Sequence, residues 1–179
     1  MNRPTKKRLG VMLGDVVSSR RIEAREAFRV KIKDACSEVN SNFKDQLFAD
    51  FKILKGLDEI GGVFNGLAPA YKVINLIVEQ LHPVSMNFAF VYDFVDTALE
   101  TKDTAMMDGP AFHKAASELF KLKDSNLMYF MECQEKIIDS AIAGQINLLL
   151  MTKKIGQKSN TRLYGIMKRL KINTKSRRN

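Results

Sequence analysis

Along the chain, apolar residues repeat either every two residues or about every three and a half residues. The order of these two kinds of segment constrains the fold more than any other feature of the sequence. Residues 84–94, VSMNFAFVYDF, place Val84, Met86, Phe88, Phe90 and Tyr92 on one face, which predicts a β-strand. Further strands are predicted at 9–15, 47–55, 60–64 and 127–130. Apolar residues at three- and four-residue spacing predict helices over 22–43, 69–82 and 110–120.

The order strand, helix, two strands, helix, strand, helix, strand predicts an α+β domain over residues 9–130. It fits one antiparallel-leaning sheet with helices on one face, as in ferredoxin-like folds. Beyond residue 130 every apolar position fits a helix, with helices expected over 132–152 and 161–170. Residues 131–179 are therefore expected to form a small all-α tail.

Charge is distributed unevenly along the chain. The net charge is +9, yet residues 1–139 carry nineteen Lys and Arg against twenty Asp and Glu. Residues 140–179 carry ten Lys and Arg and no acidic residue. Such asymmetry favours a polyanionic partner such as DNA for the basic part, and a solvated basic end of the chain is the alternative.

Two cysteines, Cys36 and Cys133, lie far apart and match no metal-binding spacing, which is typical of reduced thiols in a cytoplasmic protein. No apolar run reaches the eighteen residues that a membrane-spanning helix needs. We therefore expect a cytoplasmic protein without a membrane partner.

Residues 14–20, GDVVSSR, follow the first predicted strand and precede a helix. In open sheets covered by helices, ligands bind in the crevice at strand ends. Gly14 permits close backbone approach, Asp15 offers oxygen ligands to a metal, and Ser18 and Arg20 suit a phosphate. Asp and Ser are also ordinary turn and capping residues, so a structural turn is the alternative.

Two more acidic sites lie near glycine in predicted loops: Asp58-Glu59 near the tip of the hairpin, and Asp108 before Gly109. Carboxylates from neighbouring strands can share a divalent cation such as Mg²⁺ that holds nucleotide phosphates, so Asp15, Asp58 and Glu59 are the candidate metal ligands. His113, one turn into the following helix, can face the Asp15 crevice or solvent. The candidate ligand-binding residues are Gly14, Asp15, Ser18, Arg20, Asp108 and Gly109.

Three segments together resemble the SatD family over about residues 9–120: Gly14–Arg20, the hairpin 55–67 (KGLDEIGGVFNGL), and Met107–Phe112. The resemblance implies a domain similar to the nucleotide-cyclase/GGDEF palm, followed by a helix-turn-helix, in a cytoplasmic regulator. One feature departs from the family pattern, because Leu57 separates Gly56 from Asp58 and Ile60 takes an aromatic position. Metal-assisted phosphoryl transfer needs accurately placed carboxylates, so this insertion argues against catalysis.

The tail resembles a helix-turn-helix in GIMKRLKINT (165–174), where Leu163, Ile166, Met167 and Leu170 supply a buried face. Lys171 stands where the turn usually has Gly, and only Thr174–Asn179 remain for a recognition helix. The predicted DNA-contacting residues are Lys168, Arg169, Lys171, Thr174, Lys175, Arg177 and Arg178.

These patterns lead to three hypotheses. The first is a DNA-binding transcriptional regulator whose N-terminal domain senses a ligand or forms a homodimer. The second is a metal-dependent protein of the nucleotidyl cyclase-like class that binds or processes nucleotides. The third is an interaction module whose basic tail docks an acidic protein.

Overall fold

The computed structural model describes residues 6–154, apart from residues 57, 68 and 134. Contacts within the chain divide it into one unit of Met1–Asn147 and a second of Leu148–Asn179. The first unit contains the five-stranded sheet described below, and the described residues of the second, 148–154, are helical.

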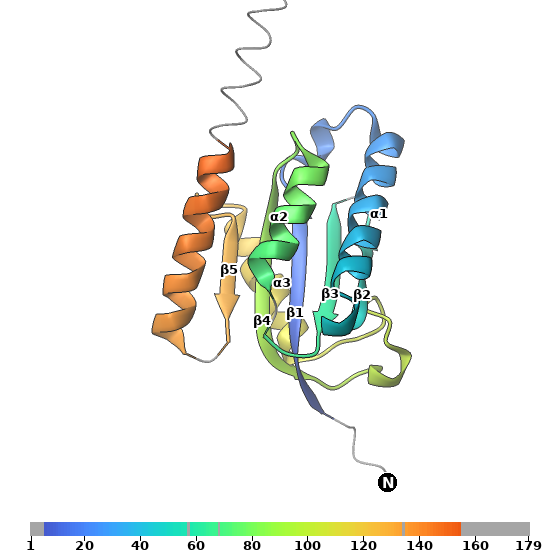
Figure 1. Cartoon of the computed structure of the whole chain (residues 1–179), viewed down its shortest axis with the longest axis vertical. Helices are drawn as coiled ribbons and strands as arrows, with labels where there is room; N and C mark the ends of the chain where they lie inside the picture. The colour runs from blue at the N-terminus through green and yellow to red at the C-terminus, as the bar shows by residue number, and fades with distance from the viewer. Residues whose placement is uncertain (1–5, 57, 68, 134, 155–179) are drawn as a thin grey trace, which may run out of the picture. The chain divides into compact units, whose positions relative to one another are not determined.

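The sheet has the order β2-β3-β1-β4-β5, so β1 lies at its centre (Figure 1). The strands are β1 (Lys7–Val16), β2 (Leu47–Lys55), β3 (Glu59–Phe64), β4 (Met86–Val95) and β5 (Tyr129–Glu132). All neighbouring strands pair antiparallel except β4 and β5, which are parallel. The predicted strands and the hairpin over 47–64 are therefore confirmed.

Three helices cover the sheet, and they lie on both of its faces. In Figure 1, α1 (Arg25–Asn42) and α2 (Ala70–Leu81) lie in front of the sheet, and α3 (Pro110–Leu122) lies behind it. Short 3-10 turns occur at Ser19–Arg21, Lys44–Gln46 and Leu99–Thr101. The α+β fold class is confirmed, but the expectation of helices on one face is wrong.

The composition of β4 explains this arrangement. One face carries Phe90, whose ring contacts Phe64 edge-to-face at 6.1 Å between centroids. Residues of the opposite face, Ala89 and Val91, are also fully buried and share a core with α3. Because both faces of β4 are apolar, both need a covering layer.

The last strand is fastened to the helix that follows it. This helix begins at residue 136 and continues to 154, the end of the described segment, close to the predicted 132–152. The Asn147 side chain accepts hydrogen bonds from the backbone N–H of Met128 (2.7 Å) and Tyr129 (3.0 Å) and donates one to the Tyr129 carbonyl (2.8 Å). The helix up to residue 147 thus belongs to the first unit.

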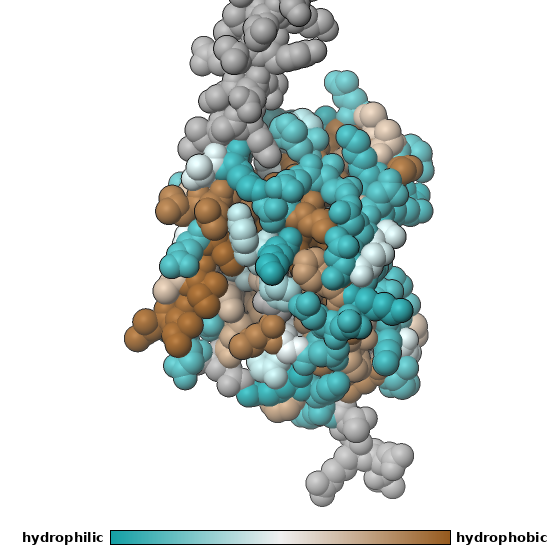
Figure 2. Space-filling view, in the orientation of Figure 1, coloured by the Kyte–Doolittle hydropathy of each residue, from teal (hydrophilic) through white to brown (hydrophobic). Residues whose placement is uncertain are grey.

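The start of this helix is apolar on its outer side. Ile137 and Ile138 are 86% and 55% exposed, and Ile142 is also exposed. In Figure 2 apolar side chains gather in the region of this helix, whereas hydrophilic side chains cover much of the rest of that face.

Candidate functional site

The carboxyl end of β1 is where the central strand leaves the sheet. Asp15 pairs in register with Glu59 of β3 and Asn87 of β4. The backbone N–H of Val16 donates to the Asp58 carbonyl at 2.8 Å, which holds the hairpin tip against the strand end. Ser18 then adopts a left-handed conformation (φ 59°), which turns the chain into the 3-10 turn Ser19–Arg21.

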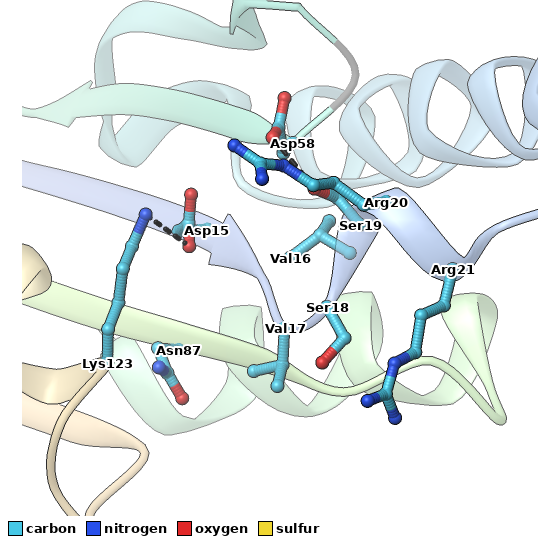
Figure 3. Close-up of a pocket in the computed structure, with 10 residues that line it drawn as sticks. All are labelled: Asp15, Val16, Val17, Ser18, Ser19, Arg20, Arg21, Asp58, Asn87 and Lys123. Atoms are coloured by element: carbon cyan, nitrogen blue, oxygen red, sulfur yellow. Dashed lines mark hydrogen bonds and ion pairs between the residues drawn. The ribbon is translucent and has the colours of Figure 1, made fainter.

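A pocket of about 460 Å³ opens at this strand end (Figure 3). We call it the exit pocket. Its lining residues are Asp15, Val16, Val17, Ser18, Ser19, Arg20, Arg21, Asp58, Asn87 and Lys123. The structure therefore brings together the predicted residues Asp15, Ser18 and Arg20 with Asp58, as expected for one site at a strand end.

An ion pair lies at the floor of the exit pocket. The Asp15 side chain is only 12% exposed, and its Oδ2 lies 3.0 Å from Nζ of Lys123, the residue that follows α3. The Ser19 hydroxyl donates to Oδ2 of Asp58 at 2.9 Å. Each carboxylate therefore has one oxygen engaged by a donor from the chain itself.

Two arginines form the outer part of the exit pocket. Arg20 and Arg21 are exposed, and neither forms an ion pair with another residue that the structure describes. Figure 3 shows the Arg20 side chain on the Asp58 side of the pocket, whereas Arg21 extends to the other side. A guanidinium group that lacks a carboxylate partner can bind an anion such as phosphate.

Glu59 lines a different, smaller pocket of about 220 Å³ on the α3 side of the sheet, together with Leu13, Thr104 and Asp108. Burial raises the pKa of Glu59, and the nearby carboxylate of Asp15 raises it further, whereas Lys55 and Lys123 act in the opposite direction. Glu59 is therefore close enough to Asp15 to sense its charge, although it does not line the exit pocket.

The Asp108–Gly109 pair does not line the exit pocket either. The Asp108 carbonyl accepts hydrogen bonds from the N–H groups of Asp96 (3.1 Å) and Thr97 (3.2 Å), and its Oδ1 accepts one from the Gly109 N–H (2.8 Å). Gly109 has φ 147°, a region essentially restricted to glycine. These two residues fasten the start of α3 to the end of β4.

The structure therefore separates two predicted parts of the ligand site. Asp108 and Gly109 precede α3, whereas Lys123, which holds Asp15, follows it. A helix of 13 residues spans roughly 20 Å. His113 lines the smaller pocket and lies 3.4 Å from Oδ1 of Asp108, so its side chain belongs to the Asp108 end.

The candidate metal ligands Asp15, Asp58 and Glu59 do not meet in one cation site, because Asp15 and Asp58 line the exit pocket whereas Glu59 lines the smaller one. Within the described part of the chain, no three His, Cys, Asp or Glu side chains gather in a metal-binding cluster. A cation on Asp15 would also lie close to the Lys123 ammonium group, which carries the same sign of charge.

Sequence reasoning overlooked Lys123 and Asn87 as pocket residues. Asn87 had a detectable signal, because it is a polar residue inside an otherwise apolar strand and is 6% exposed. Lys123 had none, since a lysine after a helix is ordinary.

The predicted DNA-contacting residues, Lys168 to Arg178, lie outside the described residues, as does the predicted helix over 161–170. Among helices of the described residues, none combines the length and the apolar character that crossing a bilayer requires.

Comparisons with known proteins agree with the fold. The structure is similar to two solved structures of a bacterial light-regulated adenylyl cyclase. The first has a TM-score of 0.51 at 13% identity and the second 0.46 at 11%; each match covers 73% of this chain and 44% of the other. The chain thus spans less than half of those proteins, and at such identity the first match shows a shared fold alone.

No curated protein matches the chain in sequence. The SatD family model matches residues 10–170, which include most of β1, the exit pocket and the described part of the C-terminal helix. This match covers most of the chain, in agreement with the resemblance of the three segments in the sequence. The chain belongs to the SatD family.

Proposed function

We propose that this chain is a nucleotide-binding protein of the nucleotidyl cyclase-like class and that the exit pocket receives the phosphate groups. The observation that supports this most is the pairing of two exposed arginines with a buried, polar strand end in one pocket. The cyclase-like sheet gives this strand end the position at which open sheets commonly bind ligands.

The chemistry of the pocket suits a phosphate. Arginine presents a planar set of N–H donors that match two phosphate oxygens at once. Ser18 also lines the pocket, and its hydroxyl can donate a further hydrogen bond. A volume of about 460 Å³ falls within the range of small-molecule sites.

We propose binding, with a sensing role, rather than turnover as the activity of this pocket. The arrangement that supports this is the Asp15–Lys123 ion pair, because it engages the carboxylate that metal-assisted phosphoryl transfer would need.

Calorimetric titration with ATP and GTP tests the proposal, on wild-type protein and on Arg20→Gln. Loss of a charge-assisted contact to phosphate is expected to weaken binding by about tenfold to a hundredfold. Arg29→Gln is the matched control, because Arg29 is an exposed arginine of α1 that does not line the exit pocket. Equal affinity of Arg20→Gln and wild-type protein, or no binding by either, contradicts the proposal.

DNA contact through the basic C-terminal residues is a second candidate, which the ten Lys and Arg and the absence of acid over 140–179 support. Its test is fluorescence anisotropy with duplex DNA over a salt series. Replacing Lys175, Arg177 and Arg178 by Gln should weaken binding and flatten its salt dependence. The same replacement of Arg29, Lys31 and Lys33, all exposed on α1, should not.

A further inference from the structure

Lys123 follows α3, which packs against β1, and its side chain contacts Asp15 at the buried end of that strand. We propose that its ammonium group takes the place of a divalent cation at Asp15, so that a ligand phosphate in the exit pocket is met by Lys123 and not by a metal ion. The identity of the ligand rests on the proposed function above. The replacement of the cation does not, and it can be tested without any nucleotide.

The burial of Asp15 calls for a positive charge beside it. Asp15 as a whole is 9% exposed, and a carboxylate buried to this extent needs a compensating positive charge or hydrogen bonds. A bound cation or a basic side chain can supply that charge, and here Nζ of Lys123 lies 3.0 Å from Oδ2. The charge requirement of Asp15 is thus already met by the chain.

The backbone of Lys123 holds a fixed position at the end of α3. Its backbone N–H donates to the Phe120 carbonyl at 3.1 Å, which continues the hydrogen bonding of α3. Its backbone is also helical, with φ −61° and ψ −33°. Since α3 packs against β1 and β4, the base of this side chain is held by the core of the domain.

Lys123 can contact Asp15 and a ligand at the same time. An ammonium group has three N–H donors, and its ion pair with Asp15 needs only one. The side chain is 48% exposed and lines the exit pocket, so the other donors can reach a phosphate there. In Figure 3 it approaches Asp15 from the side of the pocket opposite Arg20. The Lys123 ammonium group would then lie between the Asp15 carboxylate and the ligand phosphate, where a metal ion would otherwise lie.

The decisive experiment measures Mn²⁺ binding by electron paramagnetic resonance, with Mn²⁺ as the probe for a divalent cation and no nucleotide present. Wild-type protein is expected to show no binding that depends on Asp15. Lys123→Met removes the competing charge and should create a Mn²⁺ site. Its affinity for Mn²⁺ should be at least about tenfold higher than that of wild-type protein. The double variant Lys123→Met/Asp15→Asn should lose that site again.

Lys121→Met is the matched control, since Lys121 lies on the same helix but pairs with Glu118 at 2.8 Å, away from Asp15. It should behave as wild-type protein. Mn²⁺ binding by wild-type protein that disappears in Asp15→Asn would overturn the proposal even if Lys123→Met failed to fold. A folded Lys123→Met that gains no Mn²⁺ site would overturn it as well.

A second measurement separates this proposal from the proposed function. Nucleotide affinity of wild-type protein should be the same in EDTA and in Mg²⁺, whereas a requirement for Mg²⁺ contradicts the role of Lys123. If no nucleotide binds but the Mn²⁺ results are as expected, the proposed function is wrong and Lys123 is still the replacement for the cation.

Discussion

An aspartate next to a glycine lies near each end of α3, and the pairs Gly14-Asp15 and Asp108-Gly109 have different roles. Asp15 follows Gly14 at the end of β1, where its carboxylate is buried against Lys123 and lines the exit pocket. Asp108 precedes Gly109, and its carboxylate caps the local turn while its side chain remains half exposed. One pair therefore builds a site, and the other fastens a helix to the sheet.

The difference arises from the surroundings and not from the residues themselves. At the Asp108 end the contacts are made by backbone groups, since the Asp96 and Thr97 N–H groups both donate to one carbonyl. At the Asp15 end the important contact joins two charged side chains from different layers. Contacts made by backbone groups should be sensitive to a change in backbone conformation. The ion pair of Asp15 and Lys123 should instead be sensitive to loss of a side-chain charge. The predictions below test this contrast, from the largest expected effect to the smallest.

Gly109→Ala should lower the free energy of unfolding most, by about 2–4 kcal/mol. An added Cβ would lie 3.0 Å from backbone atoms of Asp96, Phe94 and Val95, and φ 147° would be strained for alanine. Urea unfolding measures the loss. Gly66→Ala is the control and should change stability by less than about 0.5 kcal/mol, because open space surrounds its added Cβ. A stable Gly109→Ala would mean that the Asp108 end is not a clamp.

Lys123→Met should lower the free energy of unfolding by about 1–3 kcal/mol, since it leaves the buried Asp15 carboxylate unpaired. The corresponding change at the other end, His113→Ala, should cost less than about 0.5 kcal/mol, because both partners of that pair are exposed to water. Equal losses in the two variants would remove the distinction between the two ends of α3.

Glu59→Gln should have the smallest effect, and that effect should depend on pH. The pKa of Glu59 is raised above its ordinary value of 4.5, so the folded state holds the proton more tightly than the unfolded state. The resulting stabilisation is complete below pH 4.5 and is lost as pH rises through the folded-state pKa.

Glu59→Gln carries no such proton. At pH 7 it should therefore melt at a slightly higher temperature than wild-type protein, and below pH 4.5 this advantage should disappear. Thermal melts at both pH values measure the difference. Glu23→Gln, an exposed residue before α1, serves as the control. A higher melting temperature for Glu59→Gln that persists unchanged below pH 4.5 would exclude titration as its cause.

Most of the fold was predictable because each element has its own local pattern. The alternation in β4, the glycines of the β2–β3 hairpin and the apolar stripe of α2 are all readable without tertiary information. The position of α3 on the second face was not, because small apolar residues such as Ala89 in a strand do not reveal what covers them. That information lies in contacts between segments far apart in the chain.

The exit pocket was predictable only in part, for a similar reason. Asp15, Ser18 and Arg20 share one short segment at a strand end, so sequence alone could group them. Asp108 carries the same local signal of an acid beside a glycine, and only the packing of α3 shows that it lies elsewhere. Lys123 reaches Asp15 from the end of α3, and no local pattern encodes that contact.

The central place of β1 in the sheet has a consequence for hydrogen exchange. Gly14 and Asp15 lie in a strand that is paired on both sides, so their amide hydrogens should exchange with solvent only when the whole domain unfolds. Arg20 and Arg21 follow in an exposed 3-10 turn, where brief local opening suffices for exchange. Protection of the Arg20 and Arg21 amides on addition of a nucleotide, against a constant slow background from β1, would therefore report directly on occupancy of the exit pocket.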